Sequence, residues 1–98
     1  MRKYYSDYVR HCTKLYFNLE ATPSAISDRV VYNNYVSVSN VLDRYDTATI
    51  NLIRFVYTSE SIVKAVDEFA LKSKAKPETL WYIIQTYEKD VAIERGLL

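Results

Sequence analysis

Residues 59–95, SESIVKAVDEFALKSKAKPETLWYIIQTYEKDVAIER, decide the fold that the sequence predicts. Apolar side chains recur at helical spacing in two segments, Ser59 to Leu71 and Pro77 to Arg95. Only the residues from Lys72 to Lys76 separate these segments. A link this short makes two helices pack at a steep angle, as in helix-turn-helix proteins, whose second helix enters the DNA major groove. The stretch therefore predicts a helix, a tight turn and a second helix.

Length and composition indicate a single helical domain. The chain has 98 residues, enough for one modest core, and its 49% apolar and 26% charged residues are typical of a globular protein. One Gly and two Pro are few turn formers for a sheet protein of this length. Cys12 is the only cysteine and cannot close an internal disulfide, and no charged start leads into an apolar signal or membrane span. We therefore expect an all-α protein in the reducing cytoplasm, with no membrane partner.

The first 45 residues predict two helices that form an N-terminal hairpin. Ser6 is a candidate N-cap for the first helix, and Ala21 to Ser27, which contains Pro23, is expected to be a loop. Ser27 is the candidate N-cap of the second helix. The many valines of this helix lower its helix propensity. The expected buried stripe of the first helix is Tyr5, Tyr8, Val9, Cys12, Leu15, Tyr16 and Leu19. That of the second is Val31, Tyr35, Val38, Leu42 and Tyr45, with Asn33, Asn34, Ser37, Asn40 and Arg44 on other faces.

Residues 46–98 predict three further helices, which complete a compact bundle of about five. Asp46 or Thr47 would cap a short third helix that is apolar almost all round, and Ser59 would cap the fourth. Pro77 suits the first turn of the fifth helix, and Gly96 suits its C-terminal cap. The expected inner residues of the fourth helix are Ile62, Val66, Phe69 and Ala70. Those of the fifth are Leu80, Ile83, Ile84, Tyr87 and Val91.

Several runs of the C-terminal half carry a resemblance to known regulators. They are Leu42-Asp43-Arg44-Tyr45, Leu52 to Tyr57, Ala65 to Ala70, Leu80 to Ile84 and Val91 to Leu97, with Tyr4 to His11 at the N-terminal end. In these runs the chain resembles small phage-encoded transcriptional regulators of the ArpU and RinA type, and more distantly region 4 of bacterial sigma factors. The resemblance implies a C-terminal helix-turn-helix, DNA or RNA polymerase as the partner, and action in the cytoplasm of a host cell.

The resemblance also implies which residues would meet DNA. Residues that point away from the core at the start of the fifth helix would contact bases, and lysines around it would lie near phosphates. These candidates are Glu78, Thr79, Tyr82 and Gln85 for bases, and Lys72, Lys74, Lys76 and Lys89 for phosphates. Gln can pair with adenine, Glu can accept from cytosine, and Thr can touch a thymine methyl group. The alternative is a solvated helix surface on which Glu78 only complements the helix dipole.

Two features of the sequence weigh against DNA binding. Residues 59–98 carry six Lys and Arg against seven Asp and Glu, so the predicted reading end is slightly acidic although the whole chain is +1. Local clusters of cations, which phosphate contacts require, nevertheless exist at Arg2, Lys3, Arg10 and Lys14, and again at Lys72, Lys74 and Lys76. Where many members of the family have Gly in the turn, this chain has Lys74, for which a left-handed backbone would cost roughly 1 kcal/mol.

A protein-interaction module, such as a phage inhibitor of a host protein, is the rival hypothesis. Ten Tyr in the chain supply either core packing or a contact surface, and those near the N-terminal cations could also stack on bases. Enzyme chemistry has no such support, because His11 and Cys12 are neighbours whose side chains diverge by about 100° on a helix. We expect no catalytic residues, no metal site and no cofactor, and a homodimer or a partner polymerase would supply the specificity that one module lacks.

Overall fold

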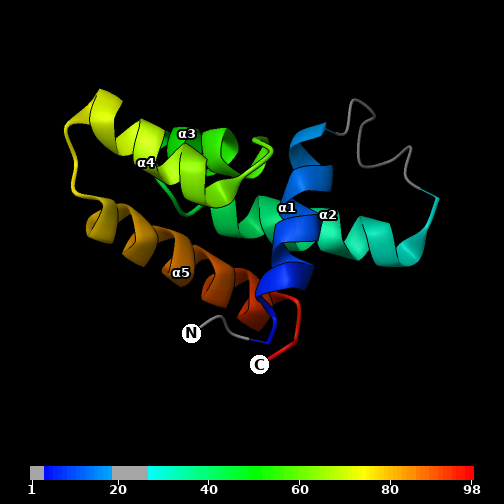
Figure 1. The fold of residues 1–98 in the computed structure, drawn as a ribbon. Coiled ribbons are helices and arrows are strands. Elements are labelled where there is room, and N and C mark those ends of the chain that lie inside the picture. Colours follow the sequence, from blue (N-terminus) through cyan, green and yellow to red (C-terminus); the bar gives the residue numbers. More distant parts are fainter. Residues whose placement is uncertain (1–3, 19–26) are drawn as a thin grey trace.

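The computed structural model describes residues 4–18 and 27–98, and these residues form an all-α bundle (Figure 1). The five helices are α1 (Ser6–Asn18), α2 (Arg29–Leu42), α3 (Thr47–Tyr57), α4 (Ile62–Ser73) and α5 (Pro77–Glu94). Within the described ranges there is no strand. The predicted all-α class is therefore confirmed. The expected loop before Ser27, together with Arg2, Lys3 and Leu19, cannot be compared because these positions lie outside the described residues.

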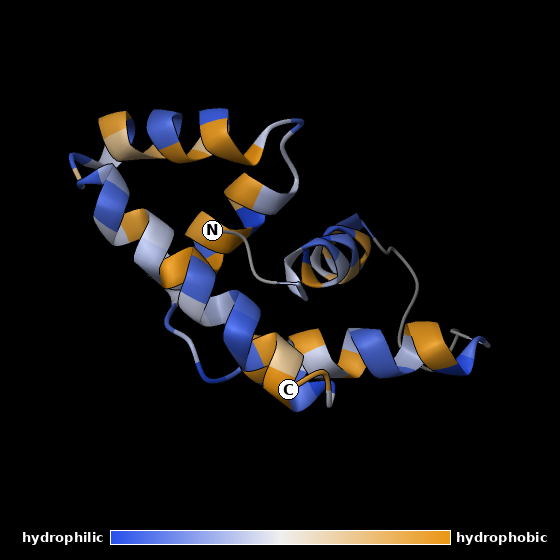
Figure 2. Ribbon diagram, turned by 60° about the horizontal axis from the view of Figure 1, so that its bottom comes forward, coloured by the Kyte–Doolittle hydropathy of each residue, from blue (hydrophilic) through white to orange (hydrophobic). Residues whose placement is uncertain are grey.

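The helices pack around α1 and α5. The first helix contacts α2, α3 and α5, and the fifth contacts α1, α2 and α4, while α3 lies against α4 (Figure 1). Apolar and polar segments alternate along each helix (Figure 2), so that one stripe faces the interior. The fully buried side chains come from every helix: Val9, Thr13, Val38, Val41, Ile53, Val56, Val66, Ile84, Tyr87 and Val91.

The helices α2, α3 and α4 begin at side-chain caps, and two of these caps correct the sequence prediction. The cap of α2 is Asp28 rather than Ser27, because its carboxylate accepts from the backbone amides of Val30 and Val31. The cap of α4 is Ser61 rather than Ser59. The Ser59 hydroxyl instead donates to the Val56 carbonyl at the end of α3.

The other helix starts lie close to the positions expected. Asp46 caps α3 as predicted, and its side chain accepts from the amide of Thr49 at 2.7 Å. A hydrogen bond from the Thr49 side chain, together with this one from the Thr49 amide, holds the pKa of the Asp46 carboxyl below its ordinary value. Ser6 is the first residue of α1 rather than a cap that precedes it. Pro77 opens α5, as predicted, directly after Lys76.

Polar side chains inside the bundle depart from the predicted stripes. Leu15 and Tyr8 are exposed, at 42% and 38%, whereas Asn34 and Ser37 are buried. The Asn34 side-chain oxygen accepts from Tyr8 at 3.0 Å and from Arg95 at 2.7 Å. An amide with two such donors can be buried without a desolvation penalty, which is why α2 turns this polar position inward.

The turn between α4 and α5 has a left-handed residue. Lys74 has φ 59° and ψ 26°, a conformation that glycine adopts without the steric cost borne by other residues. The chain therefore keeps the strained geometry with a lysine in place of glycine. The two helices leave the turn at an angle to each other (Figure 2). At the other end of α5, Gly96 adopts φ 82° just after the last helical turn, as its predicted role in the cap requires.

Candidate binding surface around the fifth helix

The outer side of α5 is open to solvent. Leu80, Ile84, Tyr87 and Val91 are buried in the core, and Ile83 is half-buried. The residues predicted from the sequence to contact bases are all exposed, namely Glu78, Thr79, Tyr82 and Gln85. Tyr82 keeps 71% of its surface exposed, so its ring is accessible to a ligand. The fifth helix is therefore anchored on one side and accessible on the other.

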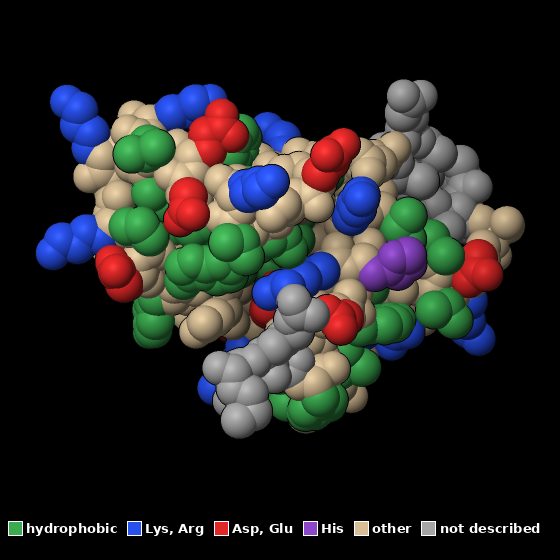
Figure 3. Space-filling view, viewed as in Figure 1, with side chains coloured by type: hydrophobic (Ala, Val, Ile, Leu, Met, Phe, Trp, Pro, Cys, Tyr) green, Lys and Arg blue, Asp and Glu red, His purple; other side chains and the backbone are tan. Residues whose placement is uncertain are grey.

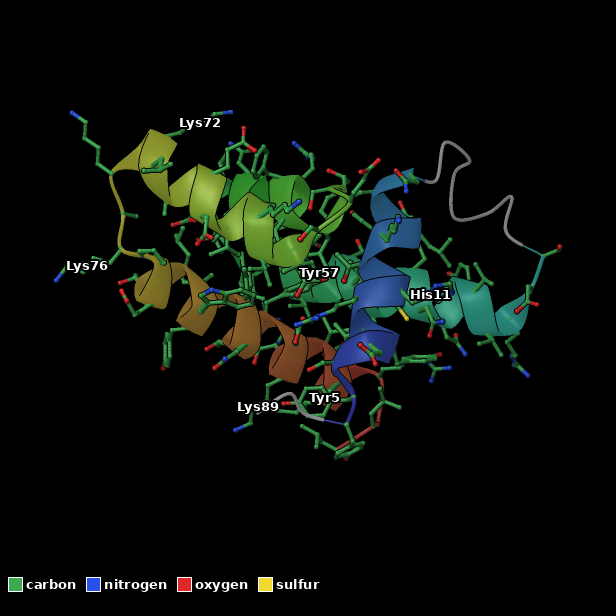
Figure 4. The ribbon with its side chains drawn as sticks, in the orientation of Figure 1. Tyr5, His11, Tyr57, Lys72, Lys76 and Lys89 are labelled. Carbon is green, nitrogen blue, oxygen red and sulfur yellow. The ribbon has the colours of Figure 1, made fainter. Side chains whose placement is uncertain are left out.

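The four predicted phosphate lysines are exposed but do not form one patch. Lys72, Lys74 and Lys76 lie at one end of α5, and Lys89 lies toward the other end (Figure 4). Thirteen residues at 1.5 Å each separate Lys76 from Lys89, a distance of about 20 Å along the axis. Lys72 is engaged on the far side of the turn, 3.1 Å from the Glu68 carboxylate and over the Phe55 ring. Lys74 and Lys76 are thus the cations closest to the start of α5.

Half of the carboxylates of α5 form ion pairs within the protein. The helix carries four carboxylates, from Glu78, Glu88, Asp90 and Glu94, against Lys89 as its only cation. Two of them form ion pairs, Glu88 with Arg10 at 2.9 Å and Glu94 with Arg44 at 3.3 Å, while Asp90 accepts a hydrogen bond from the neutral Tyr45 hydroxyl at 2.5 Å. Glu78 lies exposed in the first turn, where the helix dipole favours a carboxylate. Two of the four negative charges of α5 are therefore balanced within the protein.

A buried polar cluster links α1, α3 and α5, and the sequence analysis missed it. Glu88 is 2% exposed and accepts hydrogen bonds from Arg10 and from the Tyr57 hydroxyl. Burial and the neighbouring carboxylate raise the pKa of Tyr57 well above its ordinary value, so this phenol stays protonated and donates. A sequence signal existed, because Glu88 follows the inward-facing Ile84 by four residues.

A groove of about 540 Å³ opens above this cluster, between α5 and the starts of α1 and α4. Figure 3 shows hydrophobic side chains gathered between α4 and α5, with lysine and arginine side chains projecting at the end near the turn. The wall of the groove that α5 forms includes three of the predicted DNA-contacting residues, Tyr82, Gln85 and Lys89. The structure therefore divides the predicted set into a group at the start of α5 and a group beside the groove.

Tyrosine and phenylalanine side chains of α1 mostly serve packing. Tyr5 is buried, and Tyr16 lies 4.7 Å from Tyr35 and 5.1 Å from Phe17 between ring centres. Tyr4, which precedes α1, and Tyr8 are the exceptions, at 79% and 38% exposed. Among the described residues, the aromatic group near the N-terminus is therefore largely part of the bundle, which was the packing alternative in the sequence analysis.

The remaining chemistry of the described residues is sparse. His11 is exposed on α1 (Figure 4), while Cys12 is buried, and burial raises the pKa of its thiol, which disfavours the reactive thiolate. In residues 4–18 and 27–98, no three His, Cys, Asp or Glu side chains gather as a metal site would require. None of the helices in this part of the chain is long and apolar enough to cross a membrane. Comparison of the chain with family models, curated proteins and solved structures gave no match.

Proposed function

We propose that this protein is a small phage or mobile-element regulator that binds double-stranded DNA through α4, the lysine turn and α5. One observation carries the proposal: the first turns of α5 present Glu78, Thr79 and Tyr82 to solvent directly after the cations Lys74 and Lys76. The resemblance of residues 42–98 to phage regulators supports the same reading. The mechanism is occupancy of a site in the cytoplasm of a host cell, without catalysis or a cofactor.

The start of α5 suits a DNA-reading helix in its chemistry. Backbone amides at a helix N-terminus attract phosphate oxygens, and Lys74 and Lys76 would add two charges at the same end. Thr79 and Gln85 offer a methyl group and an amide for base edges in the major groove. Glu78 would accept from a cytosine amino group, and the nearby lysines offset its repulsion of phosphate.

The number of available lysines sets the expected strength of binding. Lys72 is held by Glu68, so we count Lys74, Lys76 and Lys89 as phosphate contacts. Three such contacts give a slope of about −2.7 in log affinity against log salt, or a loss of roughly 40-fold between about 50 mM and about 200 mM salt. A module with so few contacts needs a second copy or a partner such as RNA polymerase to reach a useful specificity.

A fluorescence-anisotropy titration with labelled duplex DNA over several salt concentrations tests the proposal. Lys74→Ala with Lys76→Ala should reduce the salt slope by about 2 and weaken binding to every sequence. The matched control, Lys14→Ala with Lys64→Ala, removes the same charge from exposed positions on α1 and on the first turns of α4. No affinity at low salt, or equal losses in both double variants, would contradict a DNA-binding start of α5.

A protein-interaction module, for instance an inhibitor of a host protein, remains the second candidate. The observation that favours it is the exposed apolar surface on α4, where Val63 is 60% exposed and Leu71 is 83% exposed. Under this alternative, the double change at Lys74 and Lys76 leaves binding to the protein partner intact, and the unmodified protein does not bind DNA.

A further inference from the structure

We propose that the groove between α1, α4 and α5 is a docking site for an amphipathic, acidic peptide segment of a partner protein. The groove has a volume of about 540 Å³, within the range that buries a small ligand or the anchoring side chains of a peptide. The groove lining shares Tyr82, Gln85 and Lys89 with the proposed DNA surface, but its apolar anchors on α4 and its peptide ligand do not depend on DNA binding.

The walls of the groove provide apolar anchoring positions. Ile62 and Val63 come from the first turn of α4, and Trp81 and Tyr82 come from α5. Val63 and Tyr82 keep 60% and 71% of their surface exposed, although they lie next to half-buried Ile62 and Trp81. An aromatic and aliphatic surface of this kind matches the hydrophobic grooves in which amphipathic helices dock.

The charge on the groove selects an acidic segment. Arg10, Glu88 and Lys89 are the charged residues of its lining. Glu88 is 2% exposed and already accepts from Arg10 and Tyr57, so its carboxylate is directed into the protein. Arg10 keeps about a fifth of its side chain exposed, at 21%, and Lys89 is exposed. Because Arg10 is already paired with Glu88, the exposed Lys89 is the cation of the lining that remains to meet a ligand, and Asp or Glu next to large apolar residues would complement it.

The groove is formed before any ligand arrives. Glu88 joins α1 to α3 and α5 through its bonds to Arg10 and Tyr57. Ser61 caps α4 immediately before Ile62 and Val63 and fixes the start of that wall. Walls held in this way limit the ordering cost of binding, which favours a short segment with few anchors.

Trp81 supplies a direct readout, because it is the only tryptophan of the chain and lines the groove. The probe is a capped synthetic helical peptide with leucines along one face and glutamates on the other, added while tryptophan fluorescence is recorded. A comparison peptide carries lysine in place of each glutamate. We expect a saturable change with the acidic peptide, at least roughly tenfold tighter than with the basic one.

Two exposed apolar residues of α4 provide a matched pair of variants. Val63→Glu places a carboxylate in the groove, and Leu71→Glu places the same group on α4 outside the groove lining. Val63→Glu should weaken the acidic peptide roughly tenfold or more, whereas Leu71→Glu should leave it within about twofold. Lys89→Glu should also weaken it and narrow its advantage over the basic peptide. Circular dichroism checks that each variant is folded.

Several outcomes would overturn the proposal. They are the absence of a saturable fluorescence change, equal binding of both peptides, or equal losses from Val63→Glu and Leu71→Glu. A concentration-dependent dimer in sedimentation that Val63→Glu dissociates would assign the groove to a second copy of this chain instead. Failure here is distinguishable from failure of DNA binding, because Val63→Glu should retain DNA affinity and the double change at Lys74 and Lys76 should retain peptide affinity.

Discussion

Replacing Glu88 with alanine is the sharpest test of what holds the bundle together. The carboxylate is 2% exposed and joins α5 to Arg10 on α1 and to Tyr57 on α3. Without it, the Tyr57 hydroxyl, on a residue only 3% exposed, loses its acceptor, which costs about 1–3 kcal/mol. Breaking a fully buried ion pair costs about 3–5 kcal/mol, but Arg10 is 21% exposed and can turn partly to water. We therefore expect a loss of about 3 kcal/mol in the free energy of unfolding.

Urea unfolding followed by circular dichroism and by Trp81 fluorescence measures this loss. In thermal unfolding, the same change should lower Tm by about 12 to 24 °C for a domain of this size. The control is Glu68→Ala, which breaks an ion pair with Lys72 whose side chains are 56% and 67% exposed. That variant should change the free energy of unfolding by no more than about 1 kcal/mol. If Glu88→Ala costs no more than Glu68→Ala, the cluster does not contribute to stability as we argue.

Three further predictions concern the tyrosines, the turn and a helix cap. Folding raises the pKa of Tyr57, and also those of Tyr45 and Tyr87. The free energy of unfolding should therefore be intact below about pH 10 and fall as pH rises above it. Urea unfolding at several alkaline pH values should show a shallower fall for Tyr57→Phe. Lys74→Gly should raise the free energy of unfolding by up to about 1 kcal/mol, whereas Lys74→Ala, which keeps the left-handed strain, should not. Equal free energies of unfolding for the two variants would contradict the strain. Ser61→Ala should cost about 1 kcal/mol and speed hydrogen exchange at the Lys64 amide, and unchanged exchange there would argue against the cap.

Helical periodicity predicted the buried faces of the helices, but the sequence did not identify the N-cap where two nearby serines were equally suitable. The stripe Leu80, Ile84, Tyr87 and Val91 is buried as the spacing indicates. Local chemistry alone does not choose between Ser59 and Ser61 as a cap. Ser59 is committed to the Val56 carbonyl of the preceding helix, and this contact depends on how α3 ends.

Buried polar groups were beyond local pattern reading because their partners are distant in the chain. Asn34 meets Tyr8 and Arg95, which lie 26 and 61 residues away, and Glu88 meets Arg10 across 78 residues. No spacing within one helix predicts such pairs, although the position of Glu88 on the inner stripe of α5 was a usable sign. The groove is likewise formed by three helices that are distant in the chain. The sequence therefore indicates that Tyr82, Gln85 and Lys89 are exposed but does not predict that they line a groove.

Backbone amide shifts in nuclear magnetic resonance, recorded while short duplex DNA is added at low salt, show residue by residue whether the start of α5 binds DNA. We expect perturbations to concentrate from Lys74 to Gln85 and to fade as salt is raised, while the amides of α2 stay unchanged. A lack of perturbation in the turn and the first turns of α5, or perturbations spread evenly over the bundle, would contradict the claim that this helix start binds DNA.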